Sequence, residues 1–255
     1  AGTPTATPIA GATTPTPTST GTEGTSTPTS TDATATPTNS GSGGQGTVNI
    51  TQALPGALTV ISPLGYVEVN ALGVTSGATI LYSYTAPSLG SEDLDRLTIT
   101  ADIAAGELRV EPLIPADLLA SVEFLALAIN IPPSQTYTLA PEGDTTLIGL
   151  TSGGVVRNGS GAVLGIALDG NLDIQSADGG VSIQTALSGS EQVSIASDGG
   201  AITLQVPQGV GAAVNAETGD GEVTFTNITF SGTNFDGLAA GTVGLGSAVI
   251  NLSTG

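Results

Sequence analysis

The sequence contains no cysteine, no histidine, no methionine and no tryptophan. Without cysteine, disulfide bonds and thiolate chemistry are excluded. Without histidine, the chain lacks the commonest general base and the commonest ligand of transition metals. These absences favour a protein that is not an enzyme and that needs no cofactor.

Positive charge and long apolar runs are also scarce. Three arginines, Arg96, Arg109 and Arg157, stand against 22 acidic residues and leave a net charge of −19. Such a chain repels phosphate backbones, so nucleic acid is excluded as a partner. No stretch reaches the roughly 18 apolar residues of a membrane span, and we expect no membrane insertion. The chain begins at Ala1 without a leader pattern, and we expect a secreted, extracellular protein of the cell surface whose signal peptide has been removed.

Residues 1–46 form a low-complexity segment rich in threonine, serine and proline, with Glu23 and Asp32 as its only charges. Such a segment buries too little apolar surface to offset the entropy lost on ordering, and its prolines favour extended backbone. Tracts of this kind form O-glycosylated stalks, which we predict here; the alternative is an unmodified flexible linker. The candidate glycan acceptors are Thr3, Thr7, Thr14, Thr16, Thr27 and Thr36.

Residues 47–255 change to short runs in which apolar and polar residues alternate, separated by Gly, Pro, Asn and Asp. This pattern is typical of β-strands and turns and predicts an all-β domain. Only Pro115–Ala128 has an apolar spacing that is also compatible with a helix. Its second half alternates better as a strand, so we predict a short helical turn or loop followed by a strand.

A repeat of 21 residues runs through residues 172–226. Leu172, Val193 and Val214 are 21 residues apart, and so are the Gly-rich turns that follow them. Two strands per repeat, with one apolar and one polar face, predict a parallel β-solenoid, also called a β-helix, with 21-residue coils. We expect the glycines to supply positive φ at its corners. A β-sandwich is the alternative, but its loops vary more in length than a strict period allows.

The chain resembles a known family at this point. The residues that carry the resemblance are "LDRLTITADIAAGELRVEP", the units "DGGVSIQT" and "DGEVTFTN", and the final "INLSTG". Together they resemble the "putative adhesin" family of β-solenoid domains found on bacterial surfaces, over about Val48–Gly255. The resemblance implies a β-solenoid fold and no catalytic motif.

The end of the sequence stops halfway through a repeat. Ile250–Gly255 matches Val214–Gly219, but no second strand follows. Gly46–Thr51 matches Gly221–Thr226, so it could complete the repeat in another copy. We therefore hypothesise a head-to-tail homopolymer formed by strand addition; the alternative is that Thr47–Thr51 begins its own domain and the C-terminus is frayed. The predicted assembly residues are Thr47, Val48, Asn49, Ile50, Thr51, Ile250, Asn251, Leu252, Ser253, Thr254 and Gly255.

Acidic residues offer two weaker candidate sites. Asp178 and Asp220 hold equivalent turn positions two coils apart, near the upper limit for an inverting carboxylate pair. Aspartate before glycine is also an ordinary turn residue, and we favour that interpretation over catalysis. Calcium is the only plausible metal, with Ser91–Asp95 and the turn aspartates as candidate ligands.

Covalent glycans are expected partners. Four Asn-x-Ser/Thr sequons occur, and Asn158 is the best candidate acceptor because "VVRNGSG" reads as a loop.

Two functions fit these observations. The first is a structural subunit of an extracellular filament or surface layer. The alternative is a stalk-mounted adhesin that binds glycans or another cell. Glycan binders usually expose aromatic residues, and the chain has only four tyrosines and four phenylalanines. That scarcity favours the structural subunit.

Overall fold

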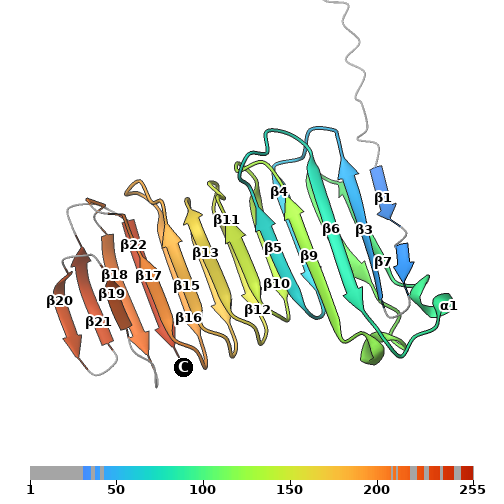
Figure 1. Ribbon diagram of the computed structural model, residues 1–255. Helices are drawn as coiled ribbons and strands as arrows, with labels where there is room; N and C mark the ends of the chain where they lie inside the picture. The colour runs from blue at the N-terminus through green and yellow to red at the C-terminus, as the bar shows by residue number, and fades with distance from the viewer. Residues whose placement is uncertain are drawn as a thin grey trace, which may run out of the picture.

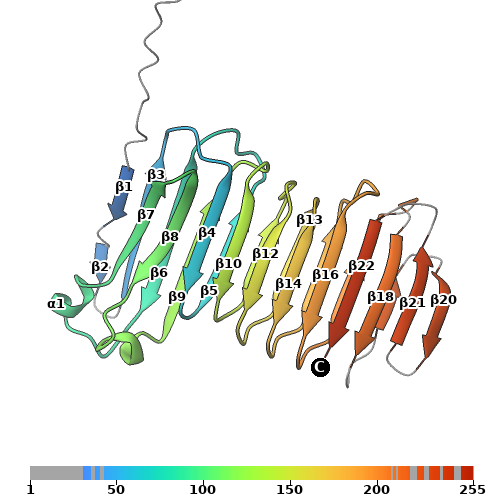
Figure 2. The same ribbon diagram turned by 180° about the vertical axis from the view of Figure 1, so that it is seen from behind.

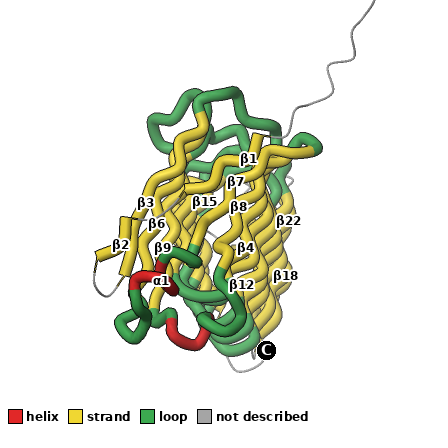
Figure 3. The backbone as a smooth tube through the Cα atoms, turned by 90° about the vertical axis from the view of Figure 1, so that its right-hand side faces the viewer, coloured by secondary structure: helices red, strands yellow, loops and turns green. Residues whose placement is uncertain are grey.

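The computed structural model describes residues 31–35, 38–40, 43–207, 209–210, 212–218, 223–226, 230–235, 238–243 and 248–254. Over these residues the protein is nearly all β, with two large mixed sheets stacked as two layers (Figures 1 and 2). Viewed from the end that carries β1 and β3, the strands of each layer lie one behind another (Figure 3). The prediction of an all-β domain is confirmed.

The larger sheet has twelve strands. Their order is β1 (Thr31–Ala35), β7 (Thr98–Ala104), β8 (Glu107–Leu113), β4 (Ala57–Ser62), β10 (Thr136–Pro141), β12 (Gly154–Asn158), β14 (Leu172–Ser176), β16 (Gln192–Ser197), β22 (Ala248–Thr254), β18 (Ala212–Thr218), β21 (Leu238–Val243) and β20 (Phe230–Phe235). From β8 to β18 every neighbour is parallel, and the pairs outside this run are antiparallel.

The smaller sheet has ten strands. Their order is β19 (Val223–Thr226), β17 (Ile202–Gln205), β15 (Val181–Thr185), β13 (Val163–Leu168), β11 (Thr145–Ile148), β5 (Tyr66–Asn70), β9 (Phe124–Asn130), β6 (Ala78–Thr85), β3 (Gly43–Ile50) and β2 (Thr38–Ser40). The strands from β19 to β9 are parallel, and β6, β3 and β2 continue the sheet antiparallel. The sheets are therefore mixed, where the sequence predicted a wholly parallel arrangement.

Alternation of side chains explains why the two sheets share one core. Along β5 and β14 every second residue is buried, and the buried side chains of both sheets form a single aliphatic cluster. Val67, Val69, Leu139, Leu147 and Ile174 have no exposed surface. Each buried side chain of this size stabilises the fold by about 1.5–3 kcal/mol relative to an exposed one.

The 21-residue repeat is confirmed in part. Leu172 pairs with Val193, and Val181 pairs with Ile202, at the predicted spacing. Before residue 172 the step is shorter, because Gly154 pairs with Leu172.

The segment that competed as a helix behaves as predicted. A single 3-10 turn, η1 (Leu119–Ser121), precedes β9. The only other helical element in the described chain is α1 (Ser91–Leu94).

Tight corners join the two sheets where β4, β12, β14 and β16 end. Ser176 and Ser197 are buried there, and each hydroxyl accepts a hydrogen bond from the backbone N–H of the glycine three residues later. These glycines, Gly179 and Gly200, lie against the corner beneath them, and an added Cβ would overlap its backbone. They do not have positive φ, so close stacking requires glycine at these corners. Positive φ occurs on the opposite side of the stack, as at Gly153 (φ 73°).

The C-terminal strand is not an open end. β22 lies between β16 and β18 and is parallel to both. Ile250 pairs with Val193 on one side and with Val214 on the other. The expectation that Ile250–Gly255 leaves an unpaired edge is therefore wrong for the described residues 250–254, and Gly255 lies outside them. Val193 and Val214, predicted to be neighbours, are separated by this strand.

Strand pairing also begins earlier than predicted. β1 pairs with β7 at five positions, and β2 forms a hairpin with β3. The predicted boundary between residues 46 and 47 therefore falls inside β3, so residues 31–35, 38–40 and 43–46 belong to the sheets.

Truncating a buried side chain of β22 should destabilise the whole protein. Ile250 and Leu252 are 1% and 3% exposed. We expect Leu252→Ala to lower the free energy of unfolding by about 2–5 kcal/mol, because it leaves a cavity. The exposed Asn251→Ala is the control and should change it by less than about 0.5 kcal/mol. Urea unfolding measures both, and equal effects would mean that β22 is not inserted.

Candidate functional site

A groove crosses the outer face of the ten-stranded sheet near its antiparallel end. Its volume is about 550 Å³. Ala126 and Ala128 of β9 form its floor, with Tyr66 of β5 on one side and Leu81 and Ser83 of β6 on the other. Thr38, Gln45, Gly46 and Thr47, from β2 and β3, extend its far wall.

Strand register produces this hollow. Ala126 pairs with Tyr66 on one side and Ser83 on the other, and Ala128 pairs with Leu81. Two alanines in the central strand thus lie between larger side chains. Strands are about 4.8 Å apart, so β5 and β6 set walls roughly 10 Å from each other. This width suits a chain of small rings or an extended peptide.

Tyr66 provides an aromatic surface with a fixed hydroxyl. Its ring is partly exposed, and its hydroxyl donates a hydrogen bond to Oε2 of Glu68 (2.9 Å). Burial raises the pKa of Tyr66, and the neighbouring Glu68 raises it further, although a hydrogen bond with Thr146 lowers it. The tyrosine is therefore neutral at physiological pH and offers both an apolar face and a polar edge.

Phe124 adds a second aromatic ring to this face of the sheet. It is 46% exposed and lies two residues before Ala126 on β9, so it points to the same side. The other described tyrosines, Tyr82, Tyr84 and Tyr137, are buried.

Charge near the groove is acidic only. Glu68 adjoins it, and none of the residues that line it is basic. The three arginines are elsewhere: Arg96 contacts Asp93 and Asp117, while Arg157 pairs with Asp173 and Arg109 with Glu111. An anionic ligand would meet no compensating charge, which favours a neutral polar ligand.

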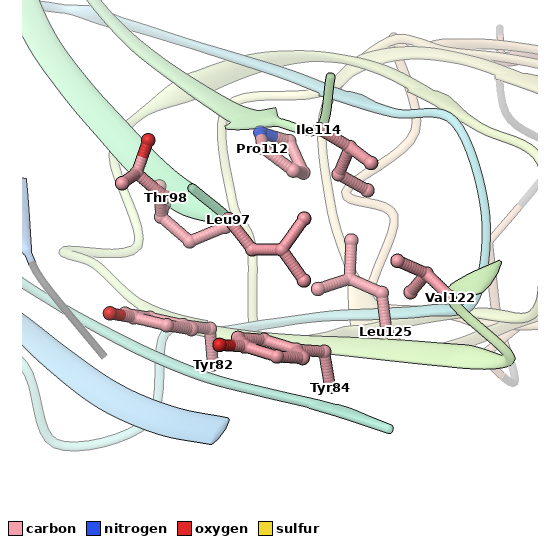
Figure 4. A pocket seen from close by; sticks show the side chains of 9 residues that line it. Tyr82, Tyr84, Leu97, Thr98, Pro112, Ile114, Val122 and Leu125 are labelled. Atoms are coloured by element: carbon pink, nitrogen blue, oxygen red, sulfur yellow. The ribbon is translucent and has the colours of Figure 1, made fainter. Parts of the chain in front are cut away.

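A second hollow lies between the sheets beneath Tyr82 and Tyr84. Figure 4 shows the two rings side by side, facing Leu97, Pro112 and other apolar side chains. Its volume of about 10 Å³ is at the lower limit for one water molecule, and its lining is apolar. Burial, with help from Tyr82 and Asp95, raises the pKa of Tyr84 to about 12, and its hydroxyl donates to the carbonyl of Leu94 (3.1 Å). This hollow is a packing gap and not a ligand site.

The twelve-stranded sheet has an outer hollow of similar volume. It measures about 590 Å³ and is lined by short polar side chains such as Thr138, Asp173, Ser194 and Asn251. These four residues lie in one row that runs across the parallel strands of this sheet. It lacks an exposed aromatic residue among those lining it, so we regard the groove on the other sheet as the better candidate.

The predicted assembly residues lie far apart in the fold. Val48 and Ile50 are buried in β3, and Thr47 lines the groove. Ile250 and Leu252 are buried in β22. Figure 1 places β3 near one end of the molecule and β22 toward the other.

The remaining residues of these two segments are exposed or are placed only by their strands. Asn49 accepts a hydrogen bond from the Thr79 hydroxyl (3.3 Å), and Thr51 follows β3 as an exposed residue. Asn251 and Ser253 are exposed, and Thr254 pairs with Ser197 and Thr218. Assembly through these segments stays a prediction.

The candidate O-glycosylation sites at Thr3, Thr7, Thr14, Thr16, Thr27 and Thr36 lie outside the described residues.

Asn158 occupies a corner and is 5% exposed. Its amide nitrogen donates to the carbonyl of Gly161, and its oxygen accepts from the hydroxyl of Thr145 (3.0 Å). It thus holds the place that Ser176 and Ser197 hold in the next corners. Asn158 is the last residue of β12 and not part of a loop, and its amide is buried and bonded in the folded chain. Its glycosylation is not tested by the structure.

The acidic candidates are dispersed. Asp93 of α1 pairs with Arg96 (3.2 Å), and Asp178 and Asp198 are exposed at separate corners. Asp220 lies outside the described residues. Among the residues that the structure describes, no three acidic side chains gather as metal ligands would. Calcium binding stays a prediction without a defined site.

One carboxylate is nevertheless strongly perturbed. Partial burial raises the pKa of Glu191, but hydrogen bonds from Ser188 and from the backbone N–H groups of Gly189 (2.7 Å) and Ser190 (2.9 Å) lower it to about 2. The carbonyl of Glu191 also accepts from the N–H of Val249 at the start of β22 (3.0 Å). The turn before β16 therefore depends on an ionised Glu191.

None of the described helices is long and apolar enough to cross a membrane.

Comparisons with known proteins support the fold but do not identify a function. No family model and no curated protein matches the chain. Among solved structures, a "putative cell adhesion protein" from Clostridium sporogenes is 13% identical, with a TM-score of 0.50 over 84% of this chain and 95% of that chain. A "putative lipid binding protein" from Parabacteroides distasonis is 10% identical, with a TM-score of 0.32 over 83% of this chain and 96% of that chain. The first shares the fold, which supports a weak resemblance to adhesin-like proteins; the second carries no argument.

Acid should loosen the turn at Glu191. A carboxylate whose pKa is lowered in the folded state stabilises the fold above its unfolded value near 4.5, and this contribution is lost as the pH falls toward 2. We expect wild type to be more stable than Glu191→Gln at pH 7 and the difference to vanish near pH 2. Urea midpoints measured between these pH values test this. A difference that is independent of pH would contradict the assigned role.

Removing the Asn158 side chain should destabilise the corner. Asn158→Ala removes one donor to the Gly161 carbonyl and leaves the buried Thr145 hydroxyl without its acceptor, at a cost of about 1–3 kcal/mol. Asn158→Ser restores the residue found at the next two corners and should cost less. Urea unfolding compares them, and mass spectrometry should find Asn158 unmodified in the protein isolated from its natural source. A glycan at Asn158 of the folded protein would overturn its assignment to the corner.

Proposed function

We propose that this chain is the folded, ligand-binding part of a cell-surface adhesin, whose binding site is the groove between β5 and β6. The proposal rests on one observation: the floor of the groove consists of small residues, and a partly exposed tyrosine lies beside it. Ala126 and Ala128 leave room for a ligand, and Tyr66 presents a ring face and a hydroxyl beside it. The fold shared with a protein described as one of cell adhesion supports this function over others.

Neutral glycans are the proposed ligands. Sugar rings stack on aromatic faces through their C–H groups, and their hydroxyls can bond to side chains such as Gln45, Thr47 and Ser83 on the groove walls. The absence of a basic residue among those lining the groove weighs against sialic and uronic acids. The net charge of −19 adds further repulsion toward acidic polymers.

The rest of the chain would display this groove. In the proposal, the parallel middle of the two sheets is a short β-solenoid that acts as a rigid body, and the Thr/Pro-rich segment is a glycosylated, extracellular stalk. Catalysis and a resident cofactor have no part in this function.

A filament subunit is the less favoured reading. The proposed joint required an open C-terminal repeat, and β22 is paired on both edges. Surface layers and biofilms could still use an adhesin of this kind.

A pair of leucines allows a matched test of the groove. Leu81 and Leu164 are 44% and 42% exposed on the same face of the ten-stranded sheet, but Leu164 lies on β13, four strands from β6. We expect Leu81→Ala and Tyr66→Ala to weaken glycan binding at least tenfold, about 1.4 kcal/mol, and Leu164→Ala to leave it unchanged.

The measurement is a screen of neutral and acidic glycans with the full chain, followed by titration of the best ligand. Unfolding curves check that each variant is folded. Equal loss of binding in Leu81→Ala and Leu164→Ala, or a preference for acidic glycans, would refute the groove as the site.

A further inference from the structure

The two sheets differ by one strand at a single level of the stack. In the ten-stranded sheet, β17 pairs directly with β19, and Ile202 faces Val223. In the twelve-stranded sheet, the strands on the same two repeats, β16 and β18, are held apart by β22. β16 and β18 are therefore one strand position further apart than β17 and β19 are in the other sheet.

The lengths of the segments that connect the strands do not explain why β16 and β18 are separated. Six residues join β15 to β16, and six join β17 to β18. Four residues separate β14 from β15, β16 from β17 and β18 from β19 in the sequence. The repeat is thus built for β18 to lie directly against β16, as β16 lies against β14.

The register across β22 confirms that β18 has been displaced without a shift along the strand. Val193 faces Ile250, which faces Val214, and Ser194 faces Asn251, which faces Asn215. Withdrawing β22 would leave β16 and β18 aligned at the 21-residue spacing of the other repeats.

Two segments of the chain therefore compete for one position. Val214–Thr218, "VNAET", and Ile250–Thr254, "INLST", have the same alternation, and both run parallel to β16 or its neighbour. Ile250 and Leu252 are larger than Val214 and Ala216, the residues that would replace them beside β16. The greater apolar surface of β22 favours it in the position next to β16.

We propose that the position between β16 and β18 is a strand-acceptor site that takes β22 of the same chain or β22 of a second copy. The partner is a second copy because the site requires a parallel strand in register with β16 on one side and with β18 on the other, and β22 has this register. β22 also follows β16 and β18 in the chain, so both of its neighbours are synthesised before it. Exchange of this strand needs no change of register in either copy.

Cysteine pairs test the arrangement cleanly, because the natural chain has no cysteine. Ser194 and Asn251 are exposed and face each other on adjacent strands. In the full chain, Ser194→Cys/Asn251→Cys should form an intramolecular disulfide, since adjacent strands allow the required Cα separation. Ser194→Cys/Asn215→Cys should not, because β22 separates these positions by about two strand spacings, near 10 Å. The opposite result would mean that β18 lies against β16, and the site would not exist.

Mixing single variants tests exchange between copies. Chains with Ser194→Cys and chains with Asn251→Cys are mixed, held in urea below the unfolding midpoint, and oxidised after its removal. We expect a disulfide-linked heterodimer at least tenfold above that formed by Asn251→Cys with Ser182→Cys, an exposed position on the other sheet. Equal yields would show random collision and overturn the proposal. This outcome is independent of glycan binding by the groove.

Discussion

Close stacking of the corners is the constraint on which the rest of the structure depends. Parallel strands can be about 4.8 Å apart only if the turns that join them are equally thin. Gly161, Gly179 and Gly200 meet this need, since a side chain at any of them would overlap the corner beneath. The residue three positions earlier, Asn158, Ser176 or Ser197, lies inside the turn and bonds to its backbone. This pairing satisfies buried polar groups where two apolar sheets meet.

The groove exists because the stacking stops being regular at one end. Through the parallel middle, polar or aliphatic side chains follow one another across the outer face of the ten-stranded sheet. At β9 the chain leaves this order: β6 and β3 join antiparallel, and two alanines come between Tyr66 and Leu81. The regular part thus supplies rigidity, whereas the irregular end supplies a shaped surface. Functional surfaces on rigid β-scaffolds commonly arise where the regular pattern is broken.

The sequence predicts most of the secondary structure and the pairing within the repeats. The spacing of Leu172 and Val193 was enough to define the register of β14 and β16. It could not place β22, because Ile250–Thr254 and Val214–Thr218 have the same pattern and only their competition for burial separates them. The groove could not be predicted from the sequence either, because it depends on the pairing of Tyr66 with Ala126, which are 60 residues apart. The corner role of Asn158 had a signal, the recurrence of serine or asparagine three residues before glycine, but the sequon masked it.

For the proposed adhesin, the insertion of β22 has a mechanical consequence. A force applied through β1 and β22 would travel along the twelve-stranded sheet from β7 to β16 and leave it before β18. The strands β18, β21 and β20 would bear none of the applied force. Because β1 and β22 are strands of the loaded sheet, tension along them would shear rows of hydrogen bonds together instead of peeling them one by one. The fold would then resist pulling most strongly in the twelve-stranded sheet, which is not the sheet that carries the groove.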